Sequence, residues 1–225
     1  GVHQRLALLD KAGADSVHAH QLIMTATPIP RTLAMTAYAG LETSVIDQLP
    51  PGRKPVTTVV ISNERRNEVI TRVEAACADG KQAYWVCTLI EESDAVQAQA
   101  AEEVARELMS GLSGVTVGLV HGRMKPAEKQ AVMDRFKQGE IQLLVATTVI
   151  EVGVDVPNAS LMIIENAERL GLAQLHQLRG RVGRGGQQAS CVLLYSTPIG
   201  NLAKERLNIL RQTSDGFRIA EKDLE

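Results

Sequence analysis

Residues 126–148 read PAEKQAVMDRFKQGEIQLLVATT, and the architecture of the chain can be worked out from this stretch. Pro126 suits the first turn of a helix, because its φ is already helical and it has no N–H to satisfy. Val132, Met133 and Phe136 then recur at helical spacing, and Gly139 ends the helix. The apolar run 141–146 follows as a short strand. A helix leading into an apolar strand is the repeating unit of a parallel sheet.

The same alternation of apolar runs and amphipathic stretches continues on both sides of this segment. Helical stripes with apolar residues three and four apart occupy 69–77 and 101–112. We therefore predict an α/β fold, a parallel sheet with helices on both faces in a three-layer αβα arrangement. The predicted strands are 21–25, 56–61, 82–88, 115–120, 141–146, 161–164 and 189–195.

A proline-rich segment at residues 49–55, LPPGRKP, divides the chain. Its three prolines and one glycine interrupt both helices and central strands, so we predict a linker there. Residues 1–48 are too few for a domain and are expected to complete one whose bulk lies upstream, whereas 56–198 supply a complete domain. Residues 199–225 are charged and helical in pattern, with Leu207 and Leu210 on the apolar side. Both ends suggest a fragment of a longer protein.

The composition excludes several classes of protein. The net charge of −2 over 225 residues argues against a protein that coats nucleic acid with its whole surface. Aromatic residues make up 3%, which argues against stacking of unpaired bases on aromatic side chains and leaves contacts to backbone phosphates open. Cys77, Cys87 and Cys191 form no C-x-x-C pair, which favours reduced thiols in a cytoplasmic protein without a metal site. No signal peptide or membrane-length apolar run is present.

The run Gln177–Gly185, QLRGRVGRG, carries the strongest chemical signal. On a helical path Arg181 and Arg184, three residues apart, share one face and can reach one target together. Their forked guanidinium donors match phosphate oxygens and stay charged at any working pH. Gly180 and Gly183 leave room for an anion or a second domain to approach the backbone. The pattern fits a pair of arginine fingers, and taken by itself it also fits a solvated basic turn.

Other polar residues follow predicted strands, where open parallel sheets bind ligands. Thr147 and Thr148 offer hydroxyl and N–H groups to a phosphate, or are ordinary strand residues. Asp155 can accept a hydrogen bond from a ribose hydroxyl or cap a turn, and His121 can donate to a phosphate or satisfy local groups. Gln177 can contact a nucleotide or face water. We expect all these groups to gather with the arginine run at one edge of the sheet.

Two motifs are absent from the sequence. It contains no G-x-x-x-x-G-K-[ST] loop with an acidic pair for Mg²⁺, so a phosphoryl-transfer site is not complete within this chain. Arginine fingers can be supplied in trans by a separate domain, and this arrangement is the one we expect. A G-x-G-x-x-G turn is missing too, which counts against a dinucleotide enzyme.

Read together, these residues resemble the second motor lobe of superfamily 2 helicases. Residues 25–27 resemble motif III, residues 144–155 motif V and residues 177–184 motif VI. The match is closer to the RecG family of bacterial branch-migration helicases, through MTATPIPRT from Met24, VIDQLPPGRKP from Val45, LIEES from Leu89 and IENAERLGL from Ile164. Transcription-repair coupling factors share TATPIPRT, but the proline-rich segment and LIEES favour the RecG family.

The resemblance implies a RecA-like lobe, of P-loop NTPase type, from an enzyme that uses ATP to translocate on duplex DNA. It would act on replication forks and Holliday junctions in recombination and repair. Residues 1–48 would end the first lobe, 49–55 link the lobes, 56–198 form the second lobe and 199–225 begin a helical hairpin and translocation region. The implied partners are branched duplex DNA, an N-terminal wedge domain and the first lobe, which would hold most of the ATP and Mg²⁺. The alternatives are a coupling-factor lobe and a non-catalytic DNA-binding module.

The resemblance also implies roles for individual residues. Arg181 and Arg184 would contact the γ-phosphate as catalytic residues, and without the P-loop and acidic box the chain alone is expected to be inactive. The other implied roles are ATP binding by Gly153, Asp155 and Gln177, DNA binding by Thr147, Thr148, His121 and Gly122, and coupling of the two sites by Thr25 and Thr27.

Overall fold

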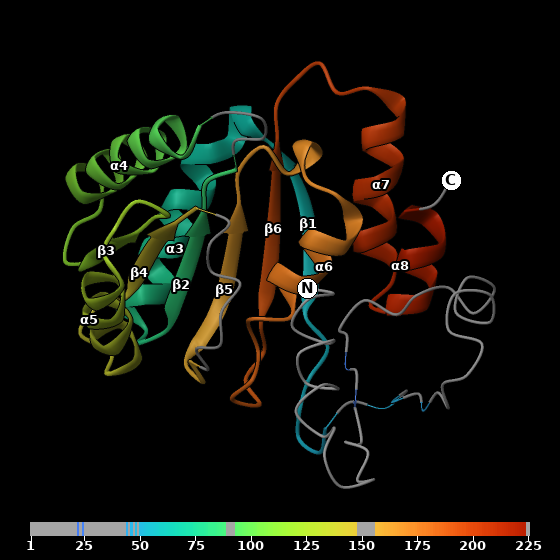
Figure 1. Ribbon diagram of the computed structural model, residues 1–225, viewed down its shortest axis with the longest axis horizontal. Helices are drawn as coiled ribbons and strands as arrows, with labels where there is room; N and C mark the ends of the chain where they lie inside the picture. The colour runs from blue at the N-terminus through green and yellow to red at the C-terminus, as the bar shows by residue number, and fades with distance from the viewer. Residues whose placement is uncertain are drawn as a thin grey trace, which may run out of the picture.

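A six-stranded parallel sheet forms the centre of the molecule (Figure 1). The computed structural model describes residues 22, 24, 44, 46, 48, 50–88, 93–147 and 156–223. The strand order is β1-β6-β5-β2-β4-β3, and every neighbouring pair is parallel. The strands are β1 (Thr57–Ser62), β2 (Gln82–Val86), β3 (Val117–Val120), β4 (Leu143–Ala146), β5 (Ala159–Ile164) and β6 (Ser190–Tyr195).

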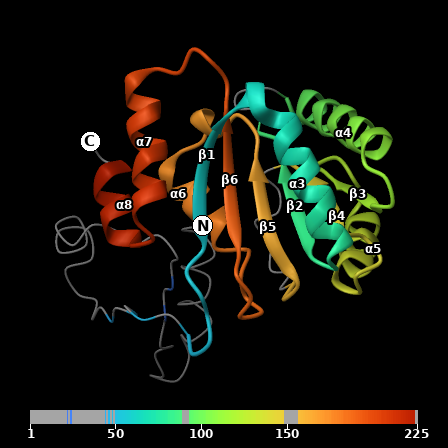
Figure 2. The same ribbon diagram turned by 180° about the vertical axis from the view of Figure 1, so that it is seen from behind.

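Helices cover both faces of this sheet, which confirms the predicted three-layer α/β fold (Figures 1 and 2). The buried side chains of α3 and α4 pack in one cluster, and those of α5 to α8 pack in the other, across the sheet. The helices are α3 (Arg66–Ala78), α4 (Asp94–Gly111), α5 (Pro126–Lys137), α6 (Leu172–Arg179), α7 (Asn201–Gln212) and α8 (Gly216–Asp223), with short 3₁₀ turns η1 (Asn63–Arg65) and η3 (Ala167–Arg169).

The burial of each strand follows from its place in the sheet. Every residue of β2 and of β4 is buried, because these central strands have helices on both faces. The edge strands β1 and β3 instead mix buried with partly buried and exposed positions. The large rings of Tyr84 and Phe136 meet edge-to-face, with centroids 5.0 Å apart, below one face of β2. Trp85, the next residue, is fully buried on the opposite face.

The helix boundaries agree with their sequence signals. Pro126 is the first residue of α5, and Gly139 follows that helix at φ +81°. Gly80 follows α3 at φ +79°, a conformation that suits glycine. The six strands from 57 to 195 lie within two residues of their predicted ends at most positions, whereas the strand predicted at 21–25 lies outside the described residues.

The three cysteines all lie within the described part of the chain. Cys77, Cys87 and Cys191 are free thiols and all are buried, and burial raises the pKa of the Cys77 thiol to about 11.

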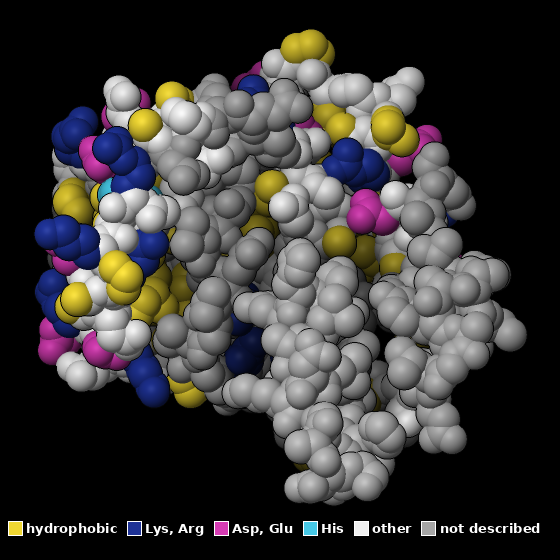
Figure 3. Space-filling view, in the orientation of Figure 1, with side chains coloured by type: hydrophobic (Ala, Val, Ile, Leu, Met, Phe, Trp, Pro, Cys, Tyr) yellow, Lys and Arg dark blue, Asp and Glu magenta, His cyan; other side chains and the backbone are white. Residues whose placement is uncertain are grey.

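On the face shown in Figure 3, Lys and Arg side chains are interspersed with Asp and Glu over α4 and α5. In the part of the chain that the structure describes, no helix is long and apolar enough to cross a membrane.

Candidate functional site

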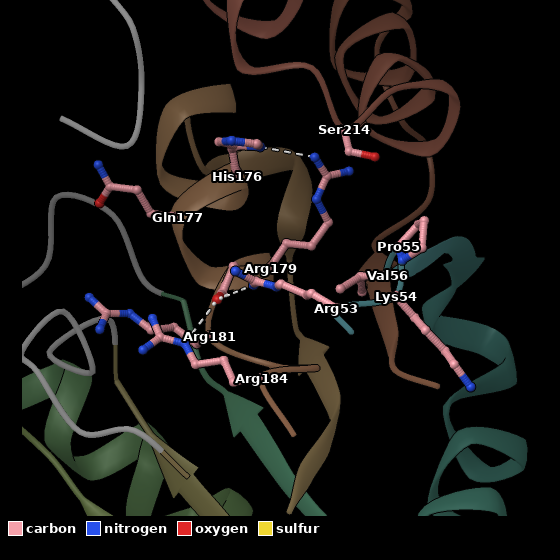
Figure 4. A pocket seen from close by; sticks show the side chains of 11 residues that line it. Arg53, Lys54, Pro55, Val56, His176, Gln177, Arg179, Arg181, Arg184 and Ser214 are labelled. Atoms are coloured by element: carbon pink, nitrogen blue, oxygen red, sulfur yellow. Dashed lines mark hydrogen bonds between the residues drawn. The ribbon is translucent and has the colours of Figure 1, made fainter. Parts of the chain in front are cut away.

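Five cationic side chains line an open pocket of about 560 Å³ beside the end of α6 (Figure 4). They come from two places in the sequence, the segment before β1 and the run that closes α6 and continues beyond it. His176, Gln177 and Ser214 supply the other polar side chains of the lining. The cationic residues are Arg53, Lys54, Arg179, Arg181 and Arg184.

The turn that carries Arg181 and Arg184 is not helical, which corrects our expectation of a shared helix face. Helix α6 ends at Arg179, and Gly180 is its C-terminal cap. Gly183 adopts φ +76°, which takes the chain off any helical path before Arg184. The two arginines still line the same pocket, because the turn folds back rather than because of helical spacing.

Internal packing explains the glycine at position 183. A Cβ added to Gly183 would lie 2.9 Å from the Cβ of Ala189. The backbone N–H of Gly183 donates to the carbonyl of Ala159 at 3.1 Å. From the sequence we expected the missing side chain to serve the approach of an anion or a second domain. Close contact with the start of β6 and the positive φ supply a different reason.

Two arginines of the pocket, Arg53 and Arg184, donate to the same backbone carbonyl, that of Gly180. The oxygen of Gly180 accepts from Nη2 of Arg53 at 3.1 Å and lies 3.4 Å from Nε of Arg184. Gly180 caps the C-terminal end of α6, where backbone carbonyls lack helical partners and attract cations. This oxygen therefore connects the segment before β1 to the arginine turn, as the dashed lines in Figure 4 show.

Arg179 is a buried residue to which the sequence pattern gave no role. Its guanidinium donates to the carbonyls of Leu210 at 2.7 Å and Thr213 at 3.0 Å, and to Oγ1 of Thr58 at 3.3 Å. Burial lowers its pKa, yet an arginine stays charged at neutral pH. Its position four residues after Leu175 and three after His176, in line with the apolar face of α6, was the available signal.

His176 stands beside this guanidinium as a neutral base. Its Nδ1 accepts from Nη2 of Arg179 at 2.9 Å, so the ring proton belongs on Nε2. Burial, together with the charge of Arg179, lowers the pKa of His176 to about 4. The cationic pocket therefore contains an imidazole that stays uncharged at neutral pH.

A second group of candidate residues follows β3 and β4. Nε2 of His121 lies 3.5 Å from Oε1 of Glu102, and Nζ of Lys129 donates to the carbonyl of Gly122 at 2.9 Å. The backbone N–H of Thr147 donates to Val120 at 3.2 Å. The Thr147 hydroxyl and Nδ1 of His121 are buried, and neither has a hydrogen-bond partner among the described residues.

The two groups lie at opposite ends of the parallel strands, one at the carboxyl ends and the other at the amino ends. The prediction that all the candidate groups gather at one edge of the sheet is therefore wrong for the described residues. Thr147 and His121 follow the carboxyl ends of β4 and β3. The arginine turn bonds to Ala159, the first residue of β5, because α6 runs back antiparallel to the strands. Five further candidates lie outside the described residues, namely Thr25, Thr27, Thr148, Gly153 and Asp155.

A parallel sheet between two layers of helices, with an arginine-rich turn after the last crossover helix, α6, is the arrangement of a helicase motor lobe. The chain belongs to the helicase conserved C-terminal domain family, which matches residues 61–186. Over its whole length it is similar to the ATP-dependent DNA helicase RecG, with 71% identity over 226 residues to that of Escherichia coli K12 and 47% to that of Bacillus subtilis. The expected resemblance to the RecG family is confirmed. The chain spans about a third of these relatives, 33% and 32% of their lengths.

A solved structure of RecG supports the same assignment. The structure of RecG bound to a three-way DNA junction matches 93% of this chain and 29% of that protein, with a TM-score of 0.76 and 44% identity. Dbp5 of S. cerevisiae, bound to RNA and ADP BeF3, matches 85% of this chain and 52% of its own, with a TM-score of 0.56 and 17% identity. At that identity the second likeness shows the fold alone.

Proposed function

We propose that this chain is the second motor lobe of a cytoplasmic, ATP-dependent DNA helicase that translocates on duplex DNA and acts on forks and Holliday junctions in recombination and repair. The observation that carries the proposal is the convergence of Arg181 and Arg184 on one cationic pocket, in a chain 71% identical throughout to E. coli RecG. An upstream motor lobe and an N-terminal wedge domain of the same protein are its proposed partners.

Arg181 and Arg184 are proposed to act on the terminal phosphate of ATP. Guanidinium groups directed at this phosphate stabilise the charge that develops on it during transfer, an effect of ~10³–10⁵ in rate for arginine fingers. Gln177 lines the same pocket and is assigned a contact with the nucleotide. Gly153 and Asp155 are assigned the remaining contacts, with the Asp155 carboxylate accepting from a ribose hydroxyl.

Mg²⁺ and most phosphate contacts are assigned to the upstream lobe. The described residues include no group of three His, Cys, Asp or Glu side chains that could hold a metal ion, and the sequence has no P-loop. The described residues of the pocket fit the anionic end of a nucleotide, and we assign its metal to the upstream lobe. We therefore expect this chain alone to hydrolyse no ATP.

DNA is proposed to bind at the other edge of the sheet. The hydroxyl of Thr147, which has no hydrogen-bond partner among the described residues, is proposed to donate to a phosphate of one strand, together with contacts from His121, Thr148 and the backbone of Gly122. Contacts of this kind recognise the backbone rather than bases, so binding is independent of sequence and sensitive to salt.

Motion follows from contacts that differ between nucleotide states. With the γ-phosphate present, the arginines draw the two lobes together, and loss of that phosphate removes the attraction. Thr25 and Thr27 are assigned the coupling between this change and the DNA site. Because the arginine turn and the Thr147 site lie at opposite edges, the coupling passes through the body of the lobe.

The test is steady-state ATPase of the full-length protein carrying Arg184→Ala, with and without forked DNA. We expect DNA-stimulated kcat to fall at least a hundredfold, while affinity for forked DNA changes little. Arg135→Ala is the matched control, because it removes an equal charge from an exposed pair with Glu140.

Near-normal DNA-stimulated ATPase in Arg184→Ala would refute the catalytic assignment. A wild-type protein that binds forked DNA but never hydrolyses ATP would instead establish the non-catalytic module. Pull-down of RNA polymerase, without preference for forked DNA, would establish a coupling-factor lobe.

A further inference from the structure

The segment before β1 is fixed against the arginine turn at two points. Nη2 of Arg53 donates to the Gly180 carbonyl at 3.1 Å, across 127 residues of sequence. The backbone of Gly52 packs close to Gly186, where an added Cβ would lie 3.2 Å from the Gly52 oxygen. Both contacts join residues 50–53 to the turn that carries Arg181 and Arg184.

Residues 50–53 form a stiff turn. The N–H of Arg53 donates to the carbonyl of Pro50 at 3.1 Å, and Gly52 adopts φ +80°. A proline at the second position and a glycine with positive φ at the third are typical of a type II turn. Arg53 is therefore attached to a short rigid element rather than to a loose chain.

The Gly180 carbonyl is the point at which this element can act on the arginines. Nε of Arg184 lies 3.4 Å from the same oxygen, so Arg53 and Arg184 share one acceptor. Gly180 also directly precedes Arg181 in the chain. A displacement of Arg53 moves the acceptor that orients Arg184 and the peptide that carries Arg181.

We propose that Arg53 is a positioning residue for the arginine turn, which couples the orientation of Arg181 and Arg184 to the position of the predicted interlobe linker. The inference rests on the proposed function, since it assumes that these arginines act on the nucleotide. Rotation of one lobe against the other moves the linker, and the Arg53–Gly180 bond transmits that movement to the turn. The arginines then adopt their catalytic orientation only in one arrangement of the lobes.

The experiment is a double-mutant cycle on DNA-stimulated ATPase of the full-length protein, with Arg53→Ala, Arg184→Ala and the pair. We expect Arg53→Ala to lower kcat roughly tenfold, because misplaced catalytic groups lose rate steeply, with KM for ATP changed less than about twofold. In the Arg184→Ala background the same substitution is expected to lower kcat by clearly less than tenfold, because only its effect through Arg181 remains. Arg53→Lys keeps one donor for the Gly180 oxygen and should restore part of kcat.

Arg135→Ala serves as the control for loss of an exposed arginine. An undiminished tenfold effect of Arg53→Ala in the Arg184→Ala background would overturn the proposal, because Arg53 would then act by itself. Full kcat in Arg53→Ala would overturn it as well, while a defect in Arg184→Ala alone leaves the proposed function intact. If Arg53→Ala reduces the yield of folded protein, the same double-mutant cycle is measured with Arg53→Lys in its place. A loss of kcat that is smaller in the Arg184→Ala background then supports the proposal, and an equal loss in both backgrounds overturns it.

Discussion

Nη2 of Arg179 lies 2.9 Å from Nδ1 of His176, one turn earlier on α6, and this pair makes the stability of the lobe depend on pH. The ordinary pKa of histidine is 6.5, and burial with the Arg179 charge lowers that of His176 to about 4. Below pH 6.5 the unfolded chain takes up a proton that the folded chain does not. The free energy of unfolding therefore decreases as the pH falls from 6.5 to about 4.

The measurable consequence is a difference between wild-type and His176→Asn chains in urea denaturation at pH 7, 6 and 5. The loss is at most about 1.4 kcal/mol per pH unit, and is smaller here because the ring is partly exposed. Asparagine keeps an acceptor for Arg179 but does not titrate, so its stability should fall less over this window. Equal pH slopes for the two chains would contradict the assignment.

Arg66 provides a comparison between buried and exposed ion pairs. Its Nε lies 2.6 Å from Oε1 of Glu165, and the two side chains are only 16% and 14% exposed. Removing Arg66 leaves the Glu165 carboxylate buried without its partner, so Arg66→Ala should cost about 3 kcal/mol in chemical denaturation. The neighbouring Arg65 pairs with Glu68 in solvent, and Arg65→Ala should cost less than about 1 kcal/mol. Similar losses in the two variants would show that burial of the first pair contributes nothing.

Gly183 should tolerate a side chain worse than a glycine of the same backbone conformation elsewhere. Gly114 has φ +73° with nothing within 4 Å of an added Cβ, so Gly114→Ala should cost about 1 kcal/mol from strain alone. Gly183→Ala adds the 2.9 Å contact with Ala189 and must move the arginine turn. We expect a larger loss of stability in urea denaturation, and a fall in ATPase of the full-length protein that Gly114→Ala does not cause. Identical behaviour of the two alanine variants would argue against a fixed turn.

Thr147→Val separates a binding role from a structural one. The Thr147 hydroxyl is buried without a described partner, so replacing it with a methyl group of similar shape should leave stability unchanged or raise it. If the hydroxyl binds a DNA phosphate, affinity for forked DNA should fall several-fold in the full-length protein, by fluorescence anisotropy at fixed salt. A destabilised chain with unchanged DNA affinity would be the opposite outcome and would remove Thr147 from the site.

The sequence predicted the layers of the fold well, because burial in a parallel sheet is encoded locally. The run Leu143–Ala146 is apolar at every position, and α5 carries Pro126 at its start and Gly139 just beyond its end. These features depend only on residues that are neighbours in the chain, so the strand and the helix form where the sequence predicts them.

The candidate site was predicted less completely, since it depends on contacts between distant residues. The bend at Gly183 is held against Ala159 and Ala189, which no local pattern near the arginines reveals. The common sheet edge was a wrong prediction that topology alone could have avoided, because a crossover helix returns the chain to the opposite edge. The contact between Arg53 and Gly180 spans 127 residues and has no local signal.

The most direct test of the account is a structure of the full-length protein bound to a transition-state mimic of ATP and to forked DNA. The account predicts guanidinium nitrogens of Arg181 and Arg184 at about 3 Å from the group that replaces the γ-phosphate. Both side chains directed into solvent, with the terminal group held by other residues, would contradict it.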